Sequence, residues 1–438
     1  MTYLLPSHNV RTQFLSYEKA MNCQAPPGVT GGARRARVMS TMTAGVRRDL
    51  TVAASNLKLQ LMAGASDRDL HRTTPSQQVA ALKESGLTLL FVPVEEGGLG
   101  GTAGDFVRIV EQLAQGDPNV AQLYLVHCFY SRHLMEGTQG EDRRHWRDRL
   151  VEERIFLGNA ASEIGTKTAL DLRTTVASGN DGSIVLEGTK FYSTGSLTAD
   201  VIAVLALEGE PGTDDVALRT VFVDAGAPGV EVDDDWFGMG QRTTGSGTIR
   251  FTDVRVDPCG VLDAAVYEAP TSPFGLQAQA GFAAIYSGIA AAAFEAAVAW
   301  VRDRARPSPP SGVERASEDP YVVLRIGEMS VVRTSAQLMV AHMADAIDRF
   351  EQEPTPTTRA DAAIAVSEAK ALAGEAALGV AERMFHVAGA SASLQKYNLS
   401  RFWRDARTLT IHDPVDYKYR LLGDYYLNDR PPPPGAFS

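Results

Sequence analysis

Residues 157–163 read Leu-Gly-Asn-Ala-Ala-Ser-Glu, and residues 187–195 read Glu-Gly-Thr-Lys-Phe-Tyr-Ser-Thr-Gly. Both stretches lie in a region, from Ile155 to about Leu262, whose apolar residues recur with a period of two. This period is typical of β-strands that have one buried face. Turn signals separate the expected strands, namely Asn180-Asp181-Gly182 and Gly226-Ala227-Pro228-Gly229. The region therefore predicts an antiparallel β domain of ordinary domain size.

The regions on either side carry a helical pattern. From about Val46 to Arg154, and again from about Gly275 to Gly423, apolar residues recur every three or four positions. A Gly-rich stretch at 92–101 is expected to form a tight connection between helices. The most apolar stretch, 281–301, is interrupted by polar residues, so we expect a buried helix there and no membrane span.

Composition excludes several classes of protein. With 438 residues, 44% of them hydrophobic, the chain can bury a large core and divide into several domains. A net charge of −11 and the lack of a long basic stripe argue against nucleic acid as a partner. Cys23, Cys128 and Cys259 form neither a disulfide framework nor a zinc motif, which predicts a reduced, cytoplasmic location and no metal. The first 42 residues lack a signal sequence and are expected to be a flexible extension.

The two quoted stretches resemble the flavin-binding strands of acyl-CoA dehydrogenases. Further motifs resemble the flavin-dependent dibenzothiophene monooxygenase branch of that superfamily. They are, in chain order, Asp234-Asp235-Trp236, Gly240-Gln241-Arg242-Thr243-Thr244-Gly245-Ser246-Gly247, Ala305-Arg306-Pro307, Glu318-Asp319-Pro320-Tyr321, Arg401-Phe402-Trp403-Arg404 and His412-Asp413-Pro414-Val415-Asp416-Tyr417-Lys418. With the Gly-rich turn, the resemblance covers the chain from about Leu87 to the C terminus.

The resemblance implies an α+β fold of the acyl-CoA dehydrogenase type. After the extension at 1–42, we expect an N-terminal helical domain at 43–154 and a central β-barrel-like domain at 155–270. A C-terminal four-helix bundle with a Pro-rich tail would follow at 271–438. The resemblance also implies a homotetramer whose flavin lies between domains, where pockets are commonly found.

One departure from the dehydrogenases bears on the reaction. Those enzymes remove a proton α to a thioester carbonyl with a carboxylate, which in many members belongs to a Glu-Gly pair near the C terminus. Here the corresponding position reads Ile411-His412-Asp413-Pro414. Asp413 is shorter than glutamate and is followed by proline, so the sequence favours oxygenation over dehydrogenation.

By similarity to the monooxygenase branch, His127, Asn159, Thr194 and His412 match residues grouped around the reactive edge of the flavin. We expect His412, helped by His127, to handle proton transfer as O2 becomes a C4a-hydroperoxyflavin, because histidine exchanges protons near neutral pH. Asn159 and Thr194 would hold the hydroperoxide by hydrogen bonds. The other expected flavin contacts are Ser162, Tyr192, Ser193 and, for the phosphate, Arg306.

These residues also have plain structural interpretations. A histidine inside an apolar segment, such as His127, can be a hydrogen-bonded residue of the core. Asn159 and Ser162 can satisfy backbone groups at a strand end. Arg306 precedes a proline and can end a helix with a favourable positive charge.

The expected cofactor is reduced FMN, with FAD as the alternative. The loop that approaches the nucleotide end of FAD in the dehydrogenases reads Ala388-Gly389-Ala390-Ser391-Ala392-Ser393 here, which departs from their Gly-rich pattern. The sequence lacks a Gly-rich nicotinamide-binding fingerprint, so a separate NAD(P)H:flavin reductase should supply the reduced flavin.

The implied function is the oxygenase component of a two-component flavin monooxygenase, acting with O2 on a small sulfur heterocycle or aromatic substrate. Three alternatives stay open from the sequence alone. The chain could N-hydroxylate an amine or amino sugar, it could be an FAD-dependent acyl-CoA dehydrogenase that uses Asp413, or it could be a non-catalytic assembly subunit.

Overall fold

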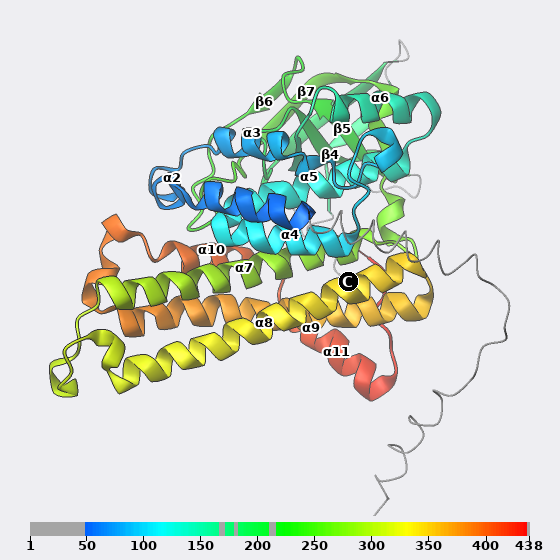
Figure 1. Ribbon diagram of the computed structural model, residues 1–438. Coiled ribbons are helices and arrows are strands. Elements are labelled where there is room, and N and C mark those ends of the chain that lie inside the picture. Colours follow the sequence, from blue (N-terminus) through cyan, green and yellow to red (C-terminus); the bar gives the residue numbers. More distant parts are fainter. Residues whose placement is uncertain (1–48, 166–170, 179–182, 210–215, 436–438) are drawn as a thin grey trace, which may run out of the picture. The chain divides into compact units, whose positions relative to one another are not determined.

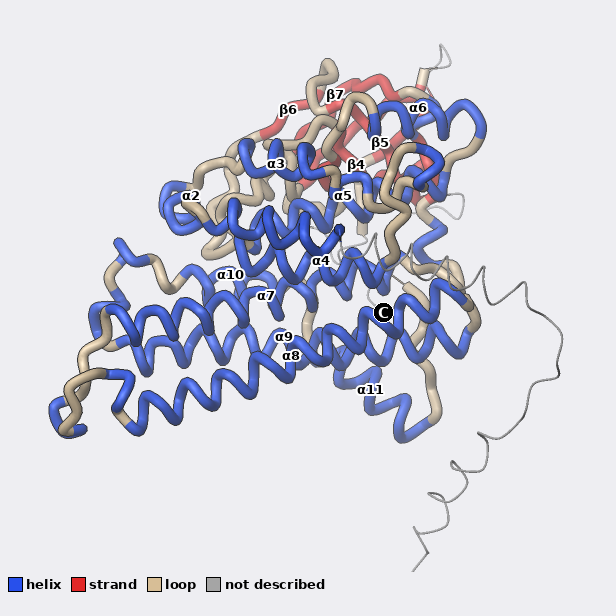
Figure 2. The backbone as a smooth tube through the Cα atoms, in the orientation of Figure 1, coloured by secondary structure: helices blue, strands red, loops and turns tan. Residues whose placement is uncertain are grey.

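A computed structural model of the chain describes residues 49–165, 171–178, 183–209 and 216–435. The predicted extension at 1–42 and the turn Asn180-Asp181-Gly182 lie outside these residues. Within them, all the strands gather in the middle of the chain and helices precede and follow (Figure 2). The structure therefore has the α+β class that the sequence predicts.

The strands form one eight-stranded sheet in the order β6-β7-β3-β2-β4-β5-β8, with β1 paired to β4. Their bounds are β1 Leu157–Ala160, β2 Thr175–Ser178, β3 Ile184–Lys190, β4 Val201–Glu208, β5 Ala217–Asp224, β6 Val230–Val232, β7 Ile249–Val256 and β8 Val261–Asp263. Both β1 and β2 pair with β4 in parallel, so the prediction of a purely antiparallel domain was wrong. An alternating pattern fixes which face of a strand is buried, and it carries no information on the direction of its neighbour.

The helices before the sheet begin with a helical segment at 49–62. It is followed by α2 Ala65–His71, α3 Ser76–Ser85, α4 Ala103–Gly116, α5 Pro118–Gly137 and α6 Gly140–Val151. Thr102 and Asp105 form a capping box at the start of α4, and Asp117 caps α5, whose first residue is Pro118. In the Gly-rich connection, a Cβ on Gly98 would lie 2.1 Å from the carbonyl oxygen of Val92, so only glycine fits.

Three long helices follow the sheet, and two short ones pack on them. They are α7 Phe274–Asp303, α8 Pro320–Gln352, α9 Pro356–Ala388, α10 Arg401–Thr410 and α11 Asp416–Asn428. α7, α8 and α9 pack against one another along their length, and both α10 and α11 pack on α9 (Figure 1). By length and composition α7 could cross a membrane, but 67% of its most apolar window is buried inside the protein.

The helices α4 and α5 join the sheet to the long helices. α4 packs on α7 and α8 (Figure 1). α5 contacts both β1 and α7. The sheet has its own apolar core, which includes Val176, Ile202 and Phe251, and a larger core joins the N-terminal helices to the bundle. The positions of β1, α5 and the start of α7 are therefore fixed relative to one another by buried apolar contacts.

At Gly240, the loop that precedes β7 packs so closely against α10 that a side chain would not fit. A Cβ on Gly240 would lie 2.1 Å from the carbonyl oxygen of Arg404, whereas a Cβ on Gly226 would meet nothing within 4 Å. We expect Gly240→Ala to lower the free energy of unfolding by about 1–3 kcal/mol, because overpacking forces backbone shifts. Gly226→Ala is the control and should change it by less than about 0.5 kcal/mol. Equal urea midpoints for the two variants would contradict this packing.

Candidate active site

β1 and the segment that follows β3 lie side by side. Asn159, on β1, donates its backbone N–H to the carbonyl oxygen of Thr194 at 2.9 Å. Beneath them the fully buried Nζ of Lys190 lies 2.8 Å from a carboxylate oxygen of Glu163. Burial lowers the pKa of Lys190, and the pairing with Glu163 opposes that shift. This buried ion pair joins the two flavin-like motifs and makes Asn159 and Thr194 neighbours.

Thr194 begins a chain of buried hydroxyl groups. Its Oγ1 lies 3.0 Å from the Oγ of Ser246, which lies 2.7 Å from the Oγ1 of Thr244. Thr244 donates its hydroxyl to the carbonyl oxygen of Gln241 at 2.9 Å, and the indole N–H of Trp236 donates to the same oxygen at 2.7 Å. We call Thr194, Ser246, Thr244 and Gln241 the hydroxyl chain. It links the β3 motif to the Gly240–Gly247 motif.

The Asn159 side chain is oriented by Tyr130 of α5, a residue that the sequence analysis did not single out. The Tyr130 hydroxyl donates to the Oδ1 of Asn159 at 2.6 Å. Burial raises the pKa of Tyr130 well above its ordinary value, so the phenol keeps its proton. The rings of Phe129 and Phe222 meet the Tyr130 ring edge-on, with centroids 5.0 and 6.1 Å away. Because Oδ1 is occupied, Asn159 presents its NH2 group to a ligand.

Helical periodicity could have found Tyr130. Asn119, Leu123 and Tyr130 are separated by four and seven residues and so share one face of α5. The Oδ1 of Asn119 accepts the backbone N–H of Thr243 at 3.1 Å, and Leu123 approaches Gly195. That face therefore lies against the loop and segment that carry the hydroxyl chain.

His127 is engaged on both ring nitrogens. Its Nε2 donates to the carbonyl oxygen of Thr88 at 2.8 Å, and its Nδ1 accepts the backbone N–H of Leu157 at 3.2 Å. The ring is fully buried and stacks on Phe156 at 4.8 Å, and burial lowers its pKa to about 4. The geometry does not support the predicted part of His127 in proton transfer. His127 instead fixes the start of β1.

His412 lies in the turn between α10 and α11, with its ring 4.7 Å from that of Phe282 on α7. The residue as a whole is exposed, while one contact of its ring is with Phe282. Burial and then the positive charge of Lys370 lower the pKa of His412 to about 4, against the opposing charge of Asp413. The imidazole is therefore neutral at neutral pH, with one ring nitrogen that can donate a hydrogen bond and one that can accept it.

Asp413, the next residue, has the opposite environment. Its Oδ2 lies 2.8 Å from the Nζ of Lys370 on α9 and 3.7 Å from the Nζ of Lys418 on α11. All three side chains are buried, and Lys370 also donates to Gln279 of α7. Burial lowers the pKa of both lysines, that of Lys418 to about 8. The Asp413 carboxylate is already paired with two ammonium groups, so it is not the free carboxylate that the dehydrogenase role, which the sequence left open, requires.

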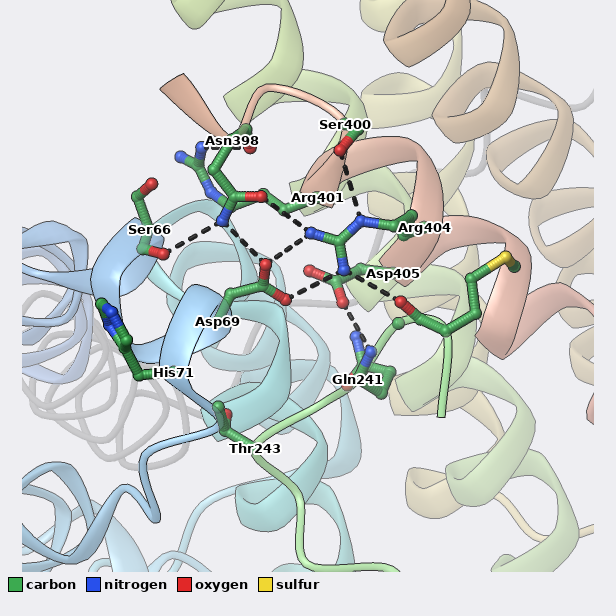
Figure 3. A network of polar contacts seen from close by, with 12 residues as sticks. Ser66, Asp69, His71, Gln241, Thr243, Asn398, Ser400, Arg401, Arg404 and Asp405 are labelled. Carbon is green, nitrogen blue, oxygen red and sulfur yellow. Dashed lines mark hydrogen bonds and ion pairs between the residues drawn. The ribbon is translucent and has the colours of Figure 1, made fainter. Parts of the chain in front are cut away.

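A polar network fixes α10 against the loop that contains Gln241 (Figure 3). The backbone N–H of Gln241 donates to the Oδ1 of Asp405 at 2.6 Å. The guanidinium of Arg404 pairs with Asp69 of α2 and donates to the carbonyl oxygen of Met239 at 2.9 Å. Because α10 ends two residues before His412, this network also sets the position of His412 relative to the hydroxyl chain.

Several buried polar atoms around the hydroxyl chain lack a hydrogen-bond partner within the part of the chain that the structure describes. They are the Oγ of Ser193, the Oγ1 of Thr243, both amide atoms of Gln241 and the Oε1 of Gln122. Each such atom costs about 1–3 kcal/mol when it stays unpaired. Beside them Tyr192 is 55% exposed, and its ring lies 6.0 Å from that of Trp236. This set fits a planar ligand with several polar edge atoms, such as an isoalloxazine ring.

Two other residues expected to contact the cofactor, Ser162 and Arg306, lie in different parts of the structure. Ser162 accepts the backbone N–H of Phe191 at 2.9 Å through its carbonyl oxygen, which holds it beside the motif. Arg306 is exposed and follows the far end of α7. From Phe282, beside His412, to that end the helix rises by about 32 Å, so Arg306 lies far from His412 within the same chain. Across the described residues, no group of three or more potential metal ligands occurs.

Family models of the acyl-CoA dehydrogenases match three consecutive parts of the chain. The N-terminal domain matches residues 53–154, the middle domain residues 159–254 and the C-terminal domain residues 280–417. Dibenzothiophene monooxygenase of Rhodococcus qingshengii is 32% identical over 401 residues, which cover 89% of this chain and 96% of that protein.

Two further similarities concern the flavin. A probable FMNH2-dependent monooxygenase of Pseudomonas putida, SfnC, is 32% identical over 395 residues, covering 88% of this chain and 96% of that protein. The FMN-bound structure of TdsC from Paenibacillus sp. A11-2 superimposes with a TM-score of 0.83 at 31% identity, covering 89% of this chain and all of that chain.

The burial of His127 makes stability depend on pH. Its pKa falls from 6.5 to about 4 on folding, so unfolded chains bind a proton that folded chains refuse between those values. We expect the free energy of unfolding to fall as pH drops from 6.5 to 4, with His127 contributing about 1.4 kcal/mol per pH unit. His127→Gln should lessen that slope in urea titrations, whereas His386→Gln, at an exposed site, should not. Parallel slopes for wild type and His127→Gln would contradict the assignment.

The hydrogen bond from Tyr130 to Asn159 can be measured as a coupling energy. Tyr130→Phe should cost about 1 kcal/mol of unfolding free energy, because it removes one hydrogen bond. In a double-mutant cycle with Asn159→Ala, the two changes should couple by about 1 kcal/mol. Tyr124→Phe, which removes a bond to the carbonyl oxygen of Leu87, is the matched control and should be additive with Asn159→Ala. Additivity of the Tyr130 pair would show that the bond is absent in solution.

Proposed function

This chain belongs to the acyl-CoA dehydrogenase family, in the branch of the dibenzothiophene monooxygenases, and from that premise we propose that it is the oxygenase component of a two-component flavin monooxygenase. It uses reduced FMN and O2 to oxygenate a small organic substrate. Relatives 31–32% identical to it are a dibenzothiophene monooxygenase, an FMNH2-dependent monooxygenase and an FMN-binding protein. They favour this function over N-hydroxylation, acyl-CoA dehydrogenation and a non-catalytic role.

The observation that supports the proposal most strongly is the contrast between the environments of His412 and Asp413. Dehydrogenation of a thioester requires a free carboxylate to take the α-proton. The only carboxylate at the matching position, Asp413, is buried between Lys370 and Lys418. The group left available at this turn is the neutral imidazole of His412, which can donate or accept a hydrogen bond toward a ligand.

Bound FMN would supply the chemistry that activates O2. His412 would accept and return a proton at its ring nitrogen, and Asn159 would donate its NH2 group to an acceptor on the ligand. Ser162, Tyr192, Ser193 and Thr194 would hold the flavin, with the unpaired hydroxyl of Ser193 gaining a partner. Phe282, packed against His412, would help to exclude bulk water from the reacting groups.

We propose a small sulfur heterocycle or aromatic compound as the substrate. TdsC, which shares the fold at 30–31% identity, has been crystallised with indole as well as with FMN. Aromatic side chains at this site, namely Tyr192, Trp236 and Phe282, offer faces on which a planar apolar substrate can stack.

We further propose a cytoplasmic homotetramer that receives reduced FMN from a separate NAD(P)H:flavin reductase. An exposed apolar stripe runs along α8 and comprises Tyr321, Leu324, Val331 and Leu338. Contiguous exposed apolar surface of this kind is typical of subunit interfaces. Assembly would also give Arg306 a role, since it could contact the flavin phosphate of a neighbouring subunit.

The proposal is tested by mixing protein with FMNH2 anaerobically, adding O2 in a stopped-flow spectrometer, and measuring oxygenated product against released H2O2. With indole or dibenzothiophene as substrate, the wild type should form a long-lived species before oxidised FMN appears. His412→Ala should lower product formation about 100-fold or more, the usual contribution of a proton-transfer group. His386→Ala, at an exposed position, is the control. Identical reoxidation of free and protein-bound FMNH2 would reject the oxygenase function.

A further inference from the structure

We infer that the hydroxyl chain makes Thr194 a hydrogen-bond acceptor toward the flavin, and that this polarity selects reduced FMN over oxidised FMN. The inference rests on the proposed function, because it takes Thr194 to face the reactive edge of a bound flavin. It assigns a specificity role to Ser246 and Thr244, which the proposed function does not use.

The donor-to-acceptor direction along the hydroxyl chain is set by its last member, the carbonyl oxygen of Gln241. A carbonyl oxygen has no hydrogen, so the 2.9 Å contact between Thr244 and the carbonyl of Gln241 is attractive only if Thr244 donates. A hydroxyl has one hydrogen, so Thr244 must accept from Ser246 at 2.7 Å. Ser246 has then used its hydrogen and must accept from Thr194 at 3.0 Å. Thr194 is left with lone pairs and no hydrogen to offer.

The Gln241 carbonyl cannot rotate away from Thr244, so the order of donors and acceptors cannot reverse. Gln241 has a left-handed φ of 51°, its N–H is held by Asp405 at 2.6 Å, and its carbonyl also accepts from Trp236 at 2.7 Å. The segments on either side of the chain are joined as well, because the N–H of Gly195 donates to the carbonyl of Thr244 at 2.8 Å. The backbone at Gln241 and Gly195 therefore fixes the donor-to-acceptor direction of the hydroxyl chain.

The two redox states of flavin differ at the atom that such an acceptor would meet. Reduced flavin carries N–H at N5, whereas oxidised flavin carries a lone pair there. An acceptor hydroxyl gains a hydrogen bond from the reduced state and sets lone pair against lone pair in the oxidised state. Asn159 adds no such preference, since the flavin carbonyl groups accept hydrogen bonds in both states. Thr194 is therefore the residue that distinguishes reduced from oxidised flavin.

The test is the ratio of two dissociation constants, which needs no turnover. Oxidised FMN is titrated by fluorescence quenching and FMNH2 by anaerobic titration, with the reduction potential of bound FMN as a check. The wild type should bind FMNH2 at least about tenfold more tightly, the effect of one hydrogen bond, which corresponds to about 30 mV for two electrons. Ser246→Ala frees the Thr194 hydrogen to point at oxidised N5, so the ratio should fall about tenfold.

Three variants separate polarity from simple loss of structure. Thr194→Val should weaken FMNH2 binding about tenfold without weakening that of oxidised FMN, and Thr194→Ser should keep the wild-type ratio. Ser196→Ala is the matched control, because Ser196 is buried in the same segment and donates to the carbonyl of Gly245 at 2.7 Å but lies outside the chain. It should keep the ratio.

A wild-type ratio near one, or a Ser246→Ala ratio equal to that of the wild type, would overturn the inference. These outcomes are distinct from failure of the proposed function. If the wild type shows the expected ratio and the Ser246→Ala change, yet releases only H2O2 with every substrate, the polarity holds and the oxygenase function fails.

Discussion

The site depends on the hydrogen bond from the backbone N–H of Gln241 to the buried carboxyl of Asp405. This contact joins the loop that carries the hydroxyl chain to α10, the helix that ends beside His412. Burial, and then the charge of Asp69, raises the pKa of Asp405 to about 7, against the opposing hydrogen bond from Gln241. Arg401 lies close enough to feel the charge of Asp405, and burial lowers the pKa of Arg401 against the opposing charges of Asp405 and Asp69. The loop, α10 and His412 therefore keep one relative position.

That position explains how the acyl-CoA dehydrogenase fold can serve a different reaction. His412 and Asp413 are adjacent in sequence, yet one is accessible and neutral while the other is buried and paired. The two lysines on α9 and α11 bind the carboxylate, whereas burial and then the charge of Lys370 disfavour a proton on the imidazole. Removing a carbon-bound proton is thereby disfavoured, and exchanging a proton with a ligand is favoured, without any change in the path of the chain.

Much of the fold and part of the candidate site were predictable from the sequence. The features that the sequence did not predict were missed for physical reasons. The periods of three to four and of two located helices and strands, and the motifs singled out Asn159 and Thr194, which are neighbours in the structure. The resemblance singled out His127, and Tyr130, three residues later, was missed although it shares a face of α5 with Asn119 and Leu123. Direction of strand pairing was missed because alternation is the same in parallel and antiparallel strands. The hydroxyl chain depends on side-chain contacts across 52 residues, which local patterns do not encode.

The unpaired polar atoms around Thr194 constrain how the cofactor is handled. The unpaired atoms of Ser193, Thr243 and Gln241 cost about 1–3 kcal/mol each without a partner, so they keep their places only if the surrounding structure prevents rearrangement. The buried Lys190–Glu163 pair and the Asp405 contact supply that rigidity. A protein that receives reduced flavin from solution needs such a site, because a preorganised pocket loses little ordering entropy when the ligand binds. The same rigidity fixes the direction of the hydroxyls of Thr194, Ser246 and Thr244, so Thr194 can distinguish two flavins that differ by hydrogen atoms alone.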